Sequence, residues 1–241
     1  MSITKQRFVI IGGSSGMGLA LAKKVVQAGG EVVLCGRSSS KLEAAVSTLA
    51  ELGGVASYQA FDASVSQDVI NAFIAIGTYD HLVVTAADLT FAPLAQLNTN
   101  DIQRMLNSKF WGPVNAAKYG LNLINRKGSV TFFSGLAAYR PAVGTTIVAA
   151  LNAGLEGFAM ALALEVKPLR VNVISPGVVD TPTWSFLSDE ERVGLFDDVA
   201  KGLPVGHVGR AEDLAGAALS VVENPFINAT VLHVDGGGRV A

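Results

Sequence analysis

The sequence contains little of the chemistry that cross-links small proteins or binds metals. Cys35 is the single cysteine among 241 residues, so no internal disulfide can form. A chain without disulfides suits a reducing compartment, and we expect a cytoplasmic protein. The chain has three histidines, and no two His, Cys or carboxylate residues stand at the spacing of paired metal ligands. We therefore expect no metal site.

Charge is also scarce, and no block of basic residues occurs. Lys and Arg total 18 against 20 Asp and Glu, which argues against nucleic acid or an anionic membrane as a partner. The first seven residues are polar and lead into an apolar run, so we expect no secretory signal. The longest weakly charged stretch, residues 142–166, contains Asn152 and Glu156. We interpret it as a buried interface helix and not as a membrane span.

Hydrophobic residues, in contrast, make up 50% of the chain, enough for one large α/β domain over residues 1–241. Apolar runs predict seven strands at 8–11, 31–35, 55–61, 81–85, 129–133, 171–174 and 230–234. Helical patterns alternate with them: one begins near Met17, and others cover 38–52, 66–76, 99–125 (interrupted at Gly112-Pro113), 146–166 and 211–222. This alternation predicts a doubly wound parallel sheet with helices on both faces. Ligands of such sheets bind at the carboxyl ends of the strands.

A glycine-rich turn directly follows the first predicted strand. It reads Gly-Gly-Ser-Ser-Gly-Met-Gly over residues 12–18 and opens a helical pattern. Glycine permits positive φ and leaves no β-carbon in the way of a phosphate. The first turn of a helix adds unpaired N–H groups and the positive end of the helix dipole. The order strand, turn, helix predicts a pyrophosphate site formed by Gly12, Ser14, Ser15, Gly16, Met17 and Gly18.

Together with further motifs, this turn resembles that of the short-chain dehydrogenase/reductase family, over nearly the full length of the chain. The matching segments are Asp62-Ala63, Ser-Pro-Gly-Val-Val-Asp-Thr-Pro at 175–182, and residues 203–210 and 234–237. Val84-Thr85-Ala86-Ala87 stands where the family has Asn-Asn-Ala-Gly. The resemblance implies a Rossmann fold, a nicotinamide dinucleotide, and a homodimer or homotetramer. It also implies that Asp62, Ala63, Ala86, Pro176, Gly177, Val179 and Thr181 bind the cofactor, with Asp62 at the adenine and Thr181 at the nicotinamide carboxamide.

The end of the second predicted strand indicates which dinucleotide binds. An acidic residue there would accept a hydrogen bond from the ribose of NAD. This chain reads Cys-Gly-Arg-Ser over 35–38, with no acid. Arg37 can present its guanidinium fork to a 2′-phosphate, and Lys41 can assist. We therefore expect NADP(H) rather than NAD(H); the alternative is that Arg37 is a solvated surface charge.

The residues that carry the family's acid–base chemistry are absent. The resemblance implies a Ser after the fifth strand, a Tyr that donates the proton, and a Lys four residues after the Tyr. An ungapped alignment places Gly135, Val148 and Asn152 at these positions. Valine cannot donate a proton, and Asn152 carries no charge, although it can still bind the cofactor's ribose. No Tyr-x-x-x-Lys occurs between Ser134 and Lys167.

Three other residues remain as catalytic candidates: Asn107, Ser134 and Tyr139. Asn107 matches the middle-helix Asn that supports a water relay in the family. Tyr139 is a candidate proton donor with Arg140 as its activator, unless it packs over the pocket mouth or a subunit contact. Ser134 either reaches the pocket or caps the strand end.

The sequence therefore favours an NADP(H)-dependent oxidoreductase that acts on a small apolar carbonyl, imine or enone-like substrate with a non-standard proton donor. Residues 182–205 are expected to form a substrate lid that is mobile until something binds. Its large apolar side chains indicate an apolar ligand or a partner surface; they include Trp184, Phe186, Leu187, Leu195 and Phe196. One alternative is a catalytically silent NADP(H)-binding regulator or partner subunit. The other is a non-redox enzyme on the same scaffold.

Overall fold

The computed structural model describes residues 2–241, and its centre is a seven-stranded sheet in which every neighbouring pair is parallel. The strands are β1 (Arg7–Ile11), β2 (Glu31–Gly36), β3 (Val55–Ala60), β4 (Tyr79–Val84), β5 (Ile124–Phe133), β6 (Arg170–Pro176) and β9 (Val231–Val234). Their order is β3-β2-β1-β4-β5-β6-β9, which confirms the predicted doubly wound sheet. Two short strands, β7 (Val179–Asp180) and β8 (Gly209–Arg210), pair separately.

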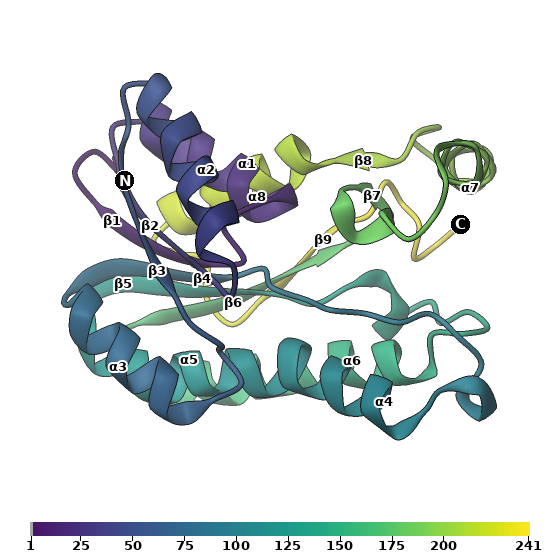
Figure 1. Ribbon diagram of the computed structural model, residues 1–241, viewed down its shortest axis with the longest axis horizontal. Coiled ribbons are helices and arrows are strands. Elements are labelled where there is room, and N and C mark those ends of the chain that lie inside the picture. Colours follow the sequence, from purple (N-terminus) through teal and green to yellow (C-terminus); the bar gives the residue numbers. More distant parts are fainter. Residues whose placement is uncertain (1) are drawn as a thin grey trace.

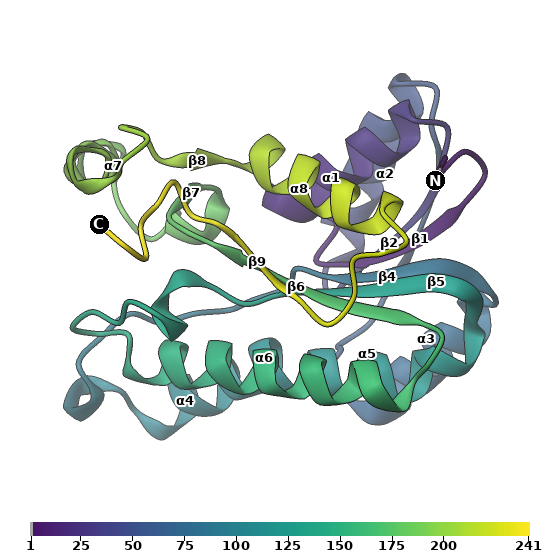
Figure 2. The same cartoon turned by 180° about the vertical axis from the view of Figure 1, so that it is seen from behind.

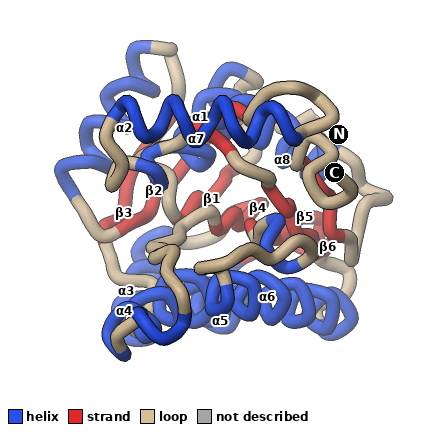
Figure 3. Tube along the Cα trace, turned by 90° about the vertical axis from the view of Figure 1, so that its right-hand side faces the viewer, coloured by secondary structure: helices blue, strands red, loops and turns tan. Residues whose placement is uncertain are grey.

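Two layers of helices cover the sheet (Figures 1 and 2). On one face lie α1 (Gly16–Gln27), α2 (Ser39–Glu51) and α8 (Ala211–Glu223). On the other lie α3 (Ser66–Ile76), α4 (Thr99–Leu106), α5 (Gly112–Gly120) and α6 (Thr146–Glu165). The helix α7 (Asp189–Gly202) lies beyond the sheet, at the right of Figure 1, together with β7 and β8. Figure 3, seen from that side, shows the sheet between the two layers.

The alternation of side chains along β1 shows why both faces need helices. Phe8 and Ile10 pack with residues of α1, α2 and α8, whereas Val9 and Ile11 pack with residues of α3, α5 and α6. All four are at most 2% exposed. A strand that is buried on both faces is apolar throughout, and that continuous run is the pattern from which this strand was predicted.

The helix predicted over residues 99–125, with an interruption at Gly112-Pro113, differs in its bounds and in where it is interrupted. The structure divides this region into α4, a π-helical turn at Asn107–Trp111, and α5, and β5 already begins at Ile124. Pro113 has no N–H to donate and its ring crowds the preceding turn, so the chain cannot continue as a regular α-helix there. The wider turn before it includes Lys109, which is 5% exposed.

Residues 182–205, the segment predicted to form a substrate lid, contain the regular helix α7. Its start is a capping box: the Ser188 hydroxyl accepts from the Glu191 N–H, and the Glu191 carboxylate accepts from the Ser188 N–H at 2.8 Å. The Ser-x-x-Glu spacing was visible in the sequence, so this helix start was predictable. No residue of α7 is buried.

Among the described residues, α6 is the helix long and apolar enough to span a membrane, with a mean hydropathy of 1.8. In the structure 44% of that window is buried, and Leu155 and Ala159 on its inner face belong to the core. Its exposed side consists largely of small residues: Ala150, Ala153, Gly154, Gly157 and Ala161.

Candidate functional site

A cavity of about 850 Å³ lies at the carboxyl ends of β1, β2, β3, β4, β5 and β6, among the loops that follow them. It is lined by most predicted cofactor-binding residues: Gly12, Ser14, Ser15, Gly16, Met17, Arg37, Asp62, Ala63, Ala86, Asn152, Pro176, Gly177, Val179 and Thr181. Gly18 does not line it. Of the catalytic candidates, Asn107 and Ser134 line the cavity and Tyr139 does not. The fold thus brings residues from six separate loops to one place.

The glycine turn is packed so closely that side chains would not fit. Gly12 has a φ of +90°, and a β-carbon on it would lie 2.6 Å from the Ala86 nitrogen. A β-carbon on Gly18 would lie 2.3 Å from the Gly12 carbonyl oxygen, so Gly18 serves helix packing rather than the cavity wall. Ser15 at the N-cap of α1 makes no side-chain capping bond, and the first turn holds no acidic residue. The unpaired N–H groups of this turn can therefore receive an anion.

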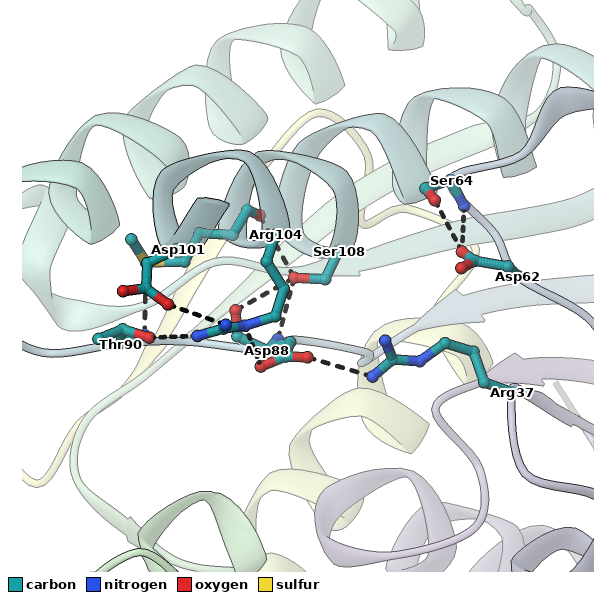
Figure 4. Close-up of polar contacts among 9 residues, drawn as sticks. Arg37, Asp62, Ser64, Asp88, Thr90, Asp101, Arg104 and Ser108 are labelled. Carbon is teal, nitrogen blue, oxygen red and sulfur yellow. Dashed lines mark hydrogen bonds and ion pairs between the residues drawn. The ribbon is translucent and has the colours of Figure 1, made fainter. Parts of the chain in front are cut away.

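Arg37, the predicted 2′-phosphate ligand, forms an ion pair across the cavity. Its Nη2 lies 3.2 Å from Oδ2 of Asp88, which follows β4. The other oxygen of Asp88 lies 3.2 Å from Nε of Arg104 on α4, so one carboxylate joins two guanidinium groups (Figure 4). Because the Arg37 side chain is 63% exposed, water screens this pair, which contributes roughly 1 kcal/mol at most.

Asp62 lies directly after β3 at the edge of the cavity. Its Oδ1 accepts hydrogen bonds from the N–H and the hydroxyl of Ser64, at 2.9 and 2.8 Å (Figure 4). Such a side-chain turn fixes the carboxylate in position.

Gly135, Val148 and Asn152 stand at the three positions where the family has its catalytic side chains, and all three are closely packed. Val148 is 4% exposed and packs with Met105 and Leu151. Asn152 is 2% exposed and donates through Nδ2 to the Gly135 carbonyl at 3.3 Å. A β-carbon at position 135 would lie 2.9 Å from that same Nδ2. Gly135 therefore makes room for Asn152, and none of the three supplies an acid or a base.

Ser134 and Tyr139 share a partner that was not predicted, Glu156 on α6. The Ser134 hydroxyl donates to Oε1 of Glu156 at 2.6 Å and the Tyr139 hydroxyl donates to Oε2 at 2.5 Å. The Tyr139 ring also packs edge-on against His233, with centroids 4.5 Å apart. Lost solvation and the bond to Glu156 raise the pKa of Tyr139 to about 12. Tyr139 was predicted as a proton donor in the site; it does not line the cavity, and its hydroxyl is bonded to Glu156.

Lys109 is a charged residue of the cavity wall that sequence reasoning missed. Its side chain is buried, and Nζ donates to the carbonyl oxygens of Phe133 at 2.9 Å and Ser134 at 3.0 Å. Burial lowers the pKa of this amine to about 8, although the negative charge of Glu156 opposes the shift.

The predicted Asn107 lies two residues before Lys109, and its Oδ1 accepts from the exposed side chain of Gln103 at 2.8 Å. Both residues line the cavity, but Asn107 is half-buried whereas Lys109 is buried. One signal was available in the sequence. Lys109 follows the apolar Met105 by four residues, which places both on the same helix face, and Met105 is fully buried.

Part of the cavity wall is apolar. Phe91 and Trp184 stack with centroids 5.4 Å apart and an angle of 13° between their rings. Leu89, Leu136 and Val148 line the cavity beside them. A small apolar molecule could pack against these side chains.

Known proteins resemble this chain over nearly its whole length. The family model described as Enoyl-(Acyl carrier protein) reductase matches residues 12–238. The 3-oxoacyl-[acyl-carrier-protein] reductase FabG of Chlamydia trachomatis serovar D is 32% identical over 240 residues, which cover 95% of each chain. The crystal structure of a small-chain dehydrogenase in complex with NADPH is 31% identical with a TM-score of 0.86, and covers 98% of this chain and 100% of that one.

A further similar structure is that of MalC Reductase/Diels-Alderase from Malbranchea aurantiaca, which is 30% identical, with a TM-score of 0.91 over 99% of this chain and 98% of that one. Sequence motifs, sheet order, cavity and relatives thus agree, and the chain belongs to the short-chain dehydrogenase/reductase family.

Proposed function

We propose that this protein is an NADP(H)-dependent reductase of a small apolar carbonyl, imine or enone-like molecule. We further propose that its proton comes from a group other than the family's Tyr. The observation that carries the proposal is one cavity that combines a dinucleotide cradle with an apolar wall. A relative in complex with NADPH supports this choice of cofactor.

The residues present fit NADP(H). The closely packed turn at Gly12 and the open N-terminus of α1 suit the pyrophosphate, and Arg37 suits the 2′-phosphate. Asp62 would contact the adenine, and Thr181, 9% exposed in the cavity wall, would hold the nicotinamide carboxamide. When bound, NADPH would supply a hydride to the substrate.

The apolar wall supports a small apolar substrate. Residues 182–205 bring Trp184 to the cavity and contain α7, which has no buried residue. Because few contacts hold α7, we propose that residues 182–205 are a lid that closes when substrate binds.

We also propose a homodimer or homotetramer in the cytoplasm. The small residues on the exposed side of α6 support close packing between subunits. The single cysteine, Cys35, is buried and forms no disulfide, as suits a reducing compartment.

Two other functions remain candidates. Val148, packed at the predicted Tyr position, favours a silent NADP(H)-binding regulator or partner subunit. A relative named both reductase and Diels-Alderase favours a non-redox reaction on the same scaffold. The experiments below separate these two functions from a reductase.

The first experiment measures cofactor binding by titrating the protein with NADPH or NADH and following nicotinamide fluorescence. We expect NADPH to bind at least about tenfold more tightly. The variant Arg37→Ala should weaken NADPH binding about ten- to a hundredfold and leave NADH unchanged, because a charged hydrogen bond contributes roughly 1.5–3 kcal/mol. Arg126→Ala, an exposed site on β5, is the control. A variant Arg37→Ala with its preference intact would refute the role of Arg37.

The second experiment follows NADPH oxidation with acetophenone, 2-methyl-1-pyrroline and 2-cyclohexen-1-one as ketone, imine and enone probes. Turnover of any probe supports the reductase. Binding without turnover of any probe favours the silent protein or the non-redox enzyme. Failure of millimolar NADPH and NADH to bind would exclude both the reductase and the silent cofactor-binding protein.

A further inference from the structure

The cavity wall contains a cation that nearby carboxylates do not neutralise by contact. Lys109 is 5% exposed, and its two acceptors are main-chain carbonyls, those of Phe133 and Ser134. Lysine is almost never buried this deeply unless it is paired, because removing its charge from water is expensive. A lysine retained here in spite of that cost suggests a task in the cavity.

The hydrogen bonds of the amine leave one N–H without an acceptor within the described residues 2–241. An ammonium has three donors, and Phe133 and Ser134 take two of them. In the same wall, Oδ1 of Asn152 is buried and has no hydrogen-bond partner. A spare donor on a residue of the cavity wall indicates a polar ligand atom that Lys109 could bind.

The charges around Lys109 come from several elements. Glu156 on α6 is 8% exposed and favours the charged amine. It acts from behind Ser134, whose carbonyl accepts from Lys109 and whose hydroxyl donates to Glu156. The other titratable groups along the cavity are Arg37, Lys41, Asp62, Asp88, Arg104 and Arg140.

We propose that Lys109 is the proton donor of this site, an inference that rests on the proposed reductase function. With NADPH as the reductant, a hydride forms a new C–H bond on the electrophilic carbon, and the π electrons move to the oxygen, nitrogen or α-carbon. The N–H bond of the Lys109 ammonium then breaks and its proton passes to that atom. The products are the reduced substrate, NADP⁺ and a neutral amine, which a proton from water recharges.

The local structure suits both protonation states of the amine. After transfer, the –NH₂ group keeps two N–H donors, which match the two carbonyls of Phe133 and Ser134. The lone pair then takes the place of the spare N–H. A pKa of about 8 leaves the ammonium mostly charged at neutral pH and still a competent acid.

The first test requires no turnover. The full-length protein is labelled with ¹⁵N-lysine, and the amine signals are followed by NMR against pH, with and without NADP⁺. We expect one signal that titrates near pH 8, is missing in Lys109→Met and shifts when NADP⁺ binds. A Lys109 signal that titrates with the exposed lysines, or that NADP⁺ leaves unmoved, would overturn the proposal.

The second test measures single-turnover oxidation of NADPH with the best of the three probes. Lys109→Met should slow this step about a hundredfold or more, the usual contribution of a general acid, with NADPH affinity unchanged. The wild-type rate should fall about tenfold per pH unit above pH 8, because the ammonium is the reactive form. Lys118→Met, at an exposed lysine of α5, is the matched control and should behave as wild type.

Lys109→Arg separates a proton donor from a simple positive charge. Arginine keeps the charge but does not release a proton near neutral pH, so we expect this variant to be as slow as Lys109→Met. If Lys109→Met does not fold, the rate of Lys109→Arg and the wild-type pH profile test whether Lys109 is the proton donor. A fast Lys109→Arg variant, or a flat wild-type profile through pH 8 to 10, contradicts the proposal. Wild-type protein that turns over no probe contradicts the proposed function instead.

Discussion

At the scale of single residues, Gly135 and Asn152 depend on each other. A methyl group at position 135 would lie 2.9 Å from Nδ2 of Asn152, which is itself 2% exposed and cannot move freely. We expect Gly135→Ala to lower the free energy of unfolding by about 1 kcal/mol or more, as overpacking does. Urea denaturation measures this change.

Two comparison variants make that measurement specific. Asn152→Ala removes the clash, so Gly135→Ala should cost less in that background than in wild type. Gly194→Ala, in the exposed middle of α7 with nothing within 4 Å of the new methyl, should stabilise by about 0.5–1 kcal/mol. Equal losses for Gly135→Ala in both backgrounds would disprove the coupling.

If Arg37 binds the 2′-phosphate as proposed, Asp88 would compete with the phosphate for its guanidinium group. Releasing a screened surface ion pair frees at most about 1 kcal/mol, so we expect Asp88→Asn to tighten NADPH binding up to about fivefold. NADH lacks the phosphate, and its affinity should change little. Fluorescence titration checks both cofactors. Weaker NADPH binding in Asp88→Asn would mean that Asp88 positions Arg37 rather than competes for it.

His81 on β4 makes stability depend on pH. It is 3% exposed and bonds to Ser129 and Gln6 at 2.8 Å each. Burial lowers its pKa from 6.5 to about 4. Since the folded pKa is below the unfolded one, the unfolded chain gains the proton first as pH falls. Stability is therefore full above about pH 6.5 and declines towards pH 4, by roughly 3 kcal/mol.

Urea denaturation at pH 7, 5.5 and 4.5 measures this slope. We expect His81→Gln to flatten it, while His207→Gln, at an exposed loop histidine, keeps it. If the slope in His81→Gln equals that of the wild type, other groups cause the acid sensitivity.

At the scale of secondary-structure elements, α7 depends on its cap because it has no buried residue. Ser188→Ala removes the capping box and should destabilise the helix by about 1 kcal/mol. Amide hydrogen exchange over residues 189–202 should then be faster by roughly fivefold, while the core strands are unchanged. Ser185→Ala, just before the helix, is the control. Slow exchange in Ser188→Ala would show that other contacts hold α7.

The sequence pattern was sufficient to predict some secondary-structure elements and insufficient for others. The residues of α3 were predicted to the residue, because a helical pattern of apolar side chains covers one buried face. The π-helical turn at Asn107–Trp111 was not predicted, because a one-residue change of helix pitch leaves the apolar pattern almost unaltered. That turn carries Lys109, so the same error hid the buried cation.

At the scale of the whole molecule, the exposed face of α6 is the candidate subunit interface. We expect the wild type to elute with at least twice its monomer mass in light-scattering chromatography. Ala153→Arg places a long charged side chain among the small residues of this face and should reduce the mass at least twofold, to a monomer from a dimer or to a dimer from a tetramer. Ala44→Arg, on exposed α2 of the opposite layer, should leave the assembly intact. A monomeric wild type would refute the proposed interface.

The sequence by itself determined the doubly wound sheet and the glycine-rich turn between β1 and α1. The apolar run of β1 and the glycine turn at residues 12–18 follow from the local geometry of the backbone. Such patterns can be recognised in the sequence without coordinates. Only the tertiary structure decided which polar groups line the cavity. Tyr139 bonds to Glu156 outside it, and Lys109 enters it between strand and helix. Burial and hydrogen bonding of a single side chain depend on neighbours distant in sequence, and no spacing along the chain records them.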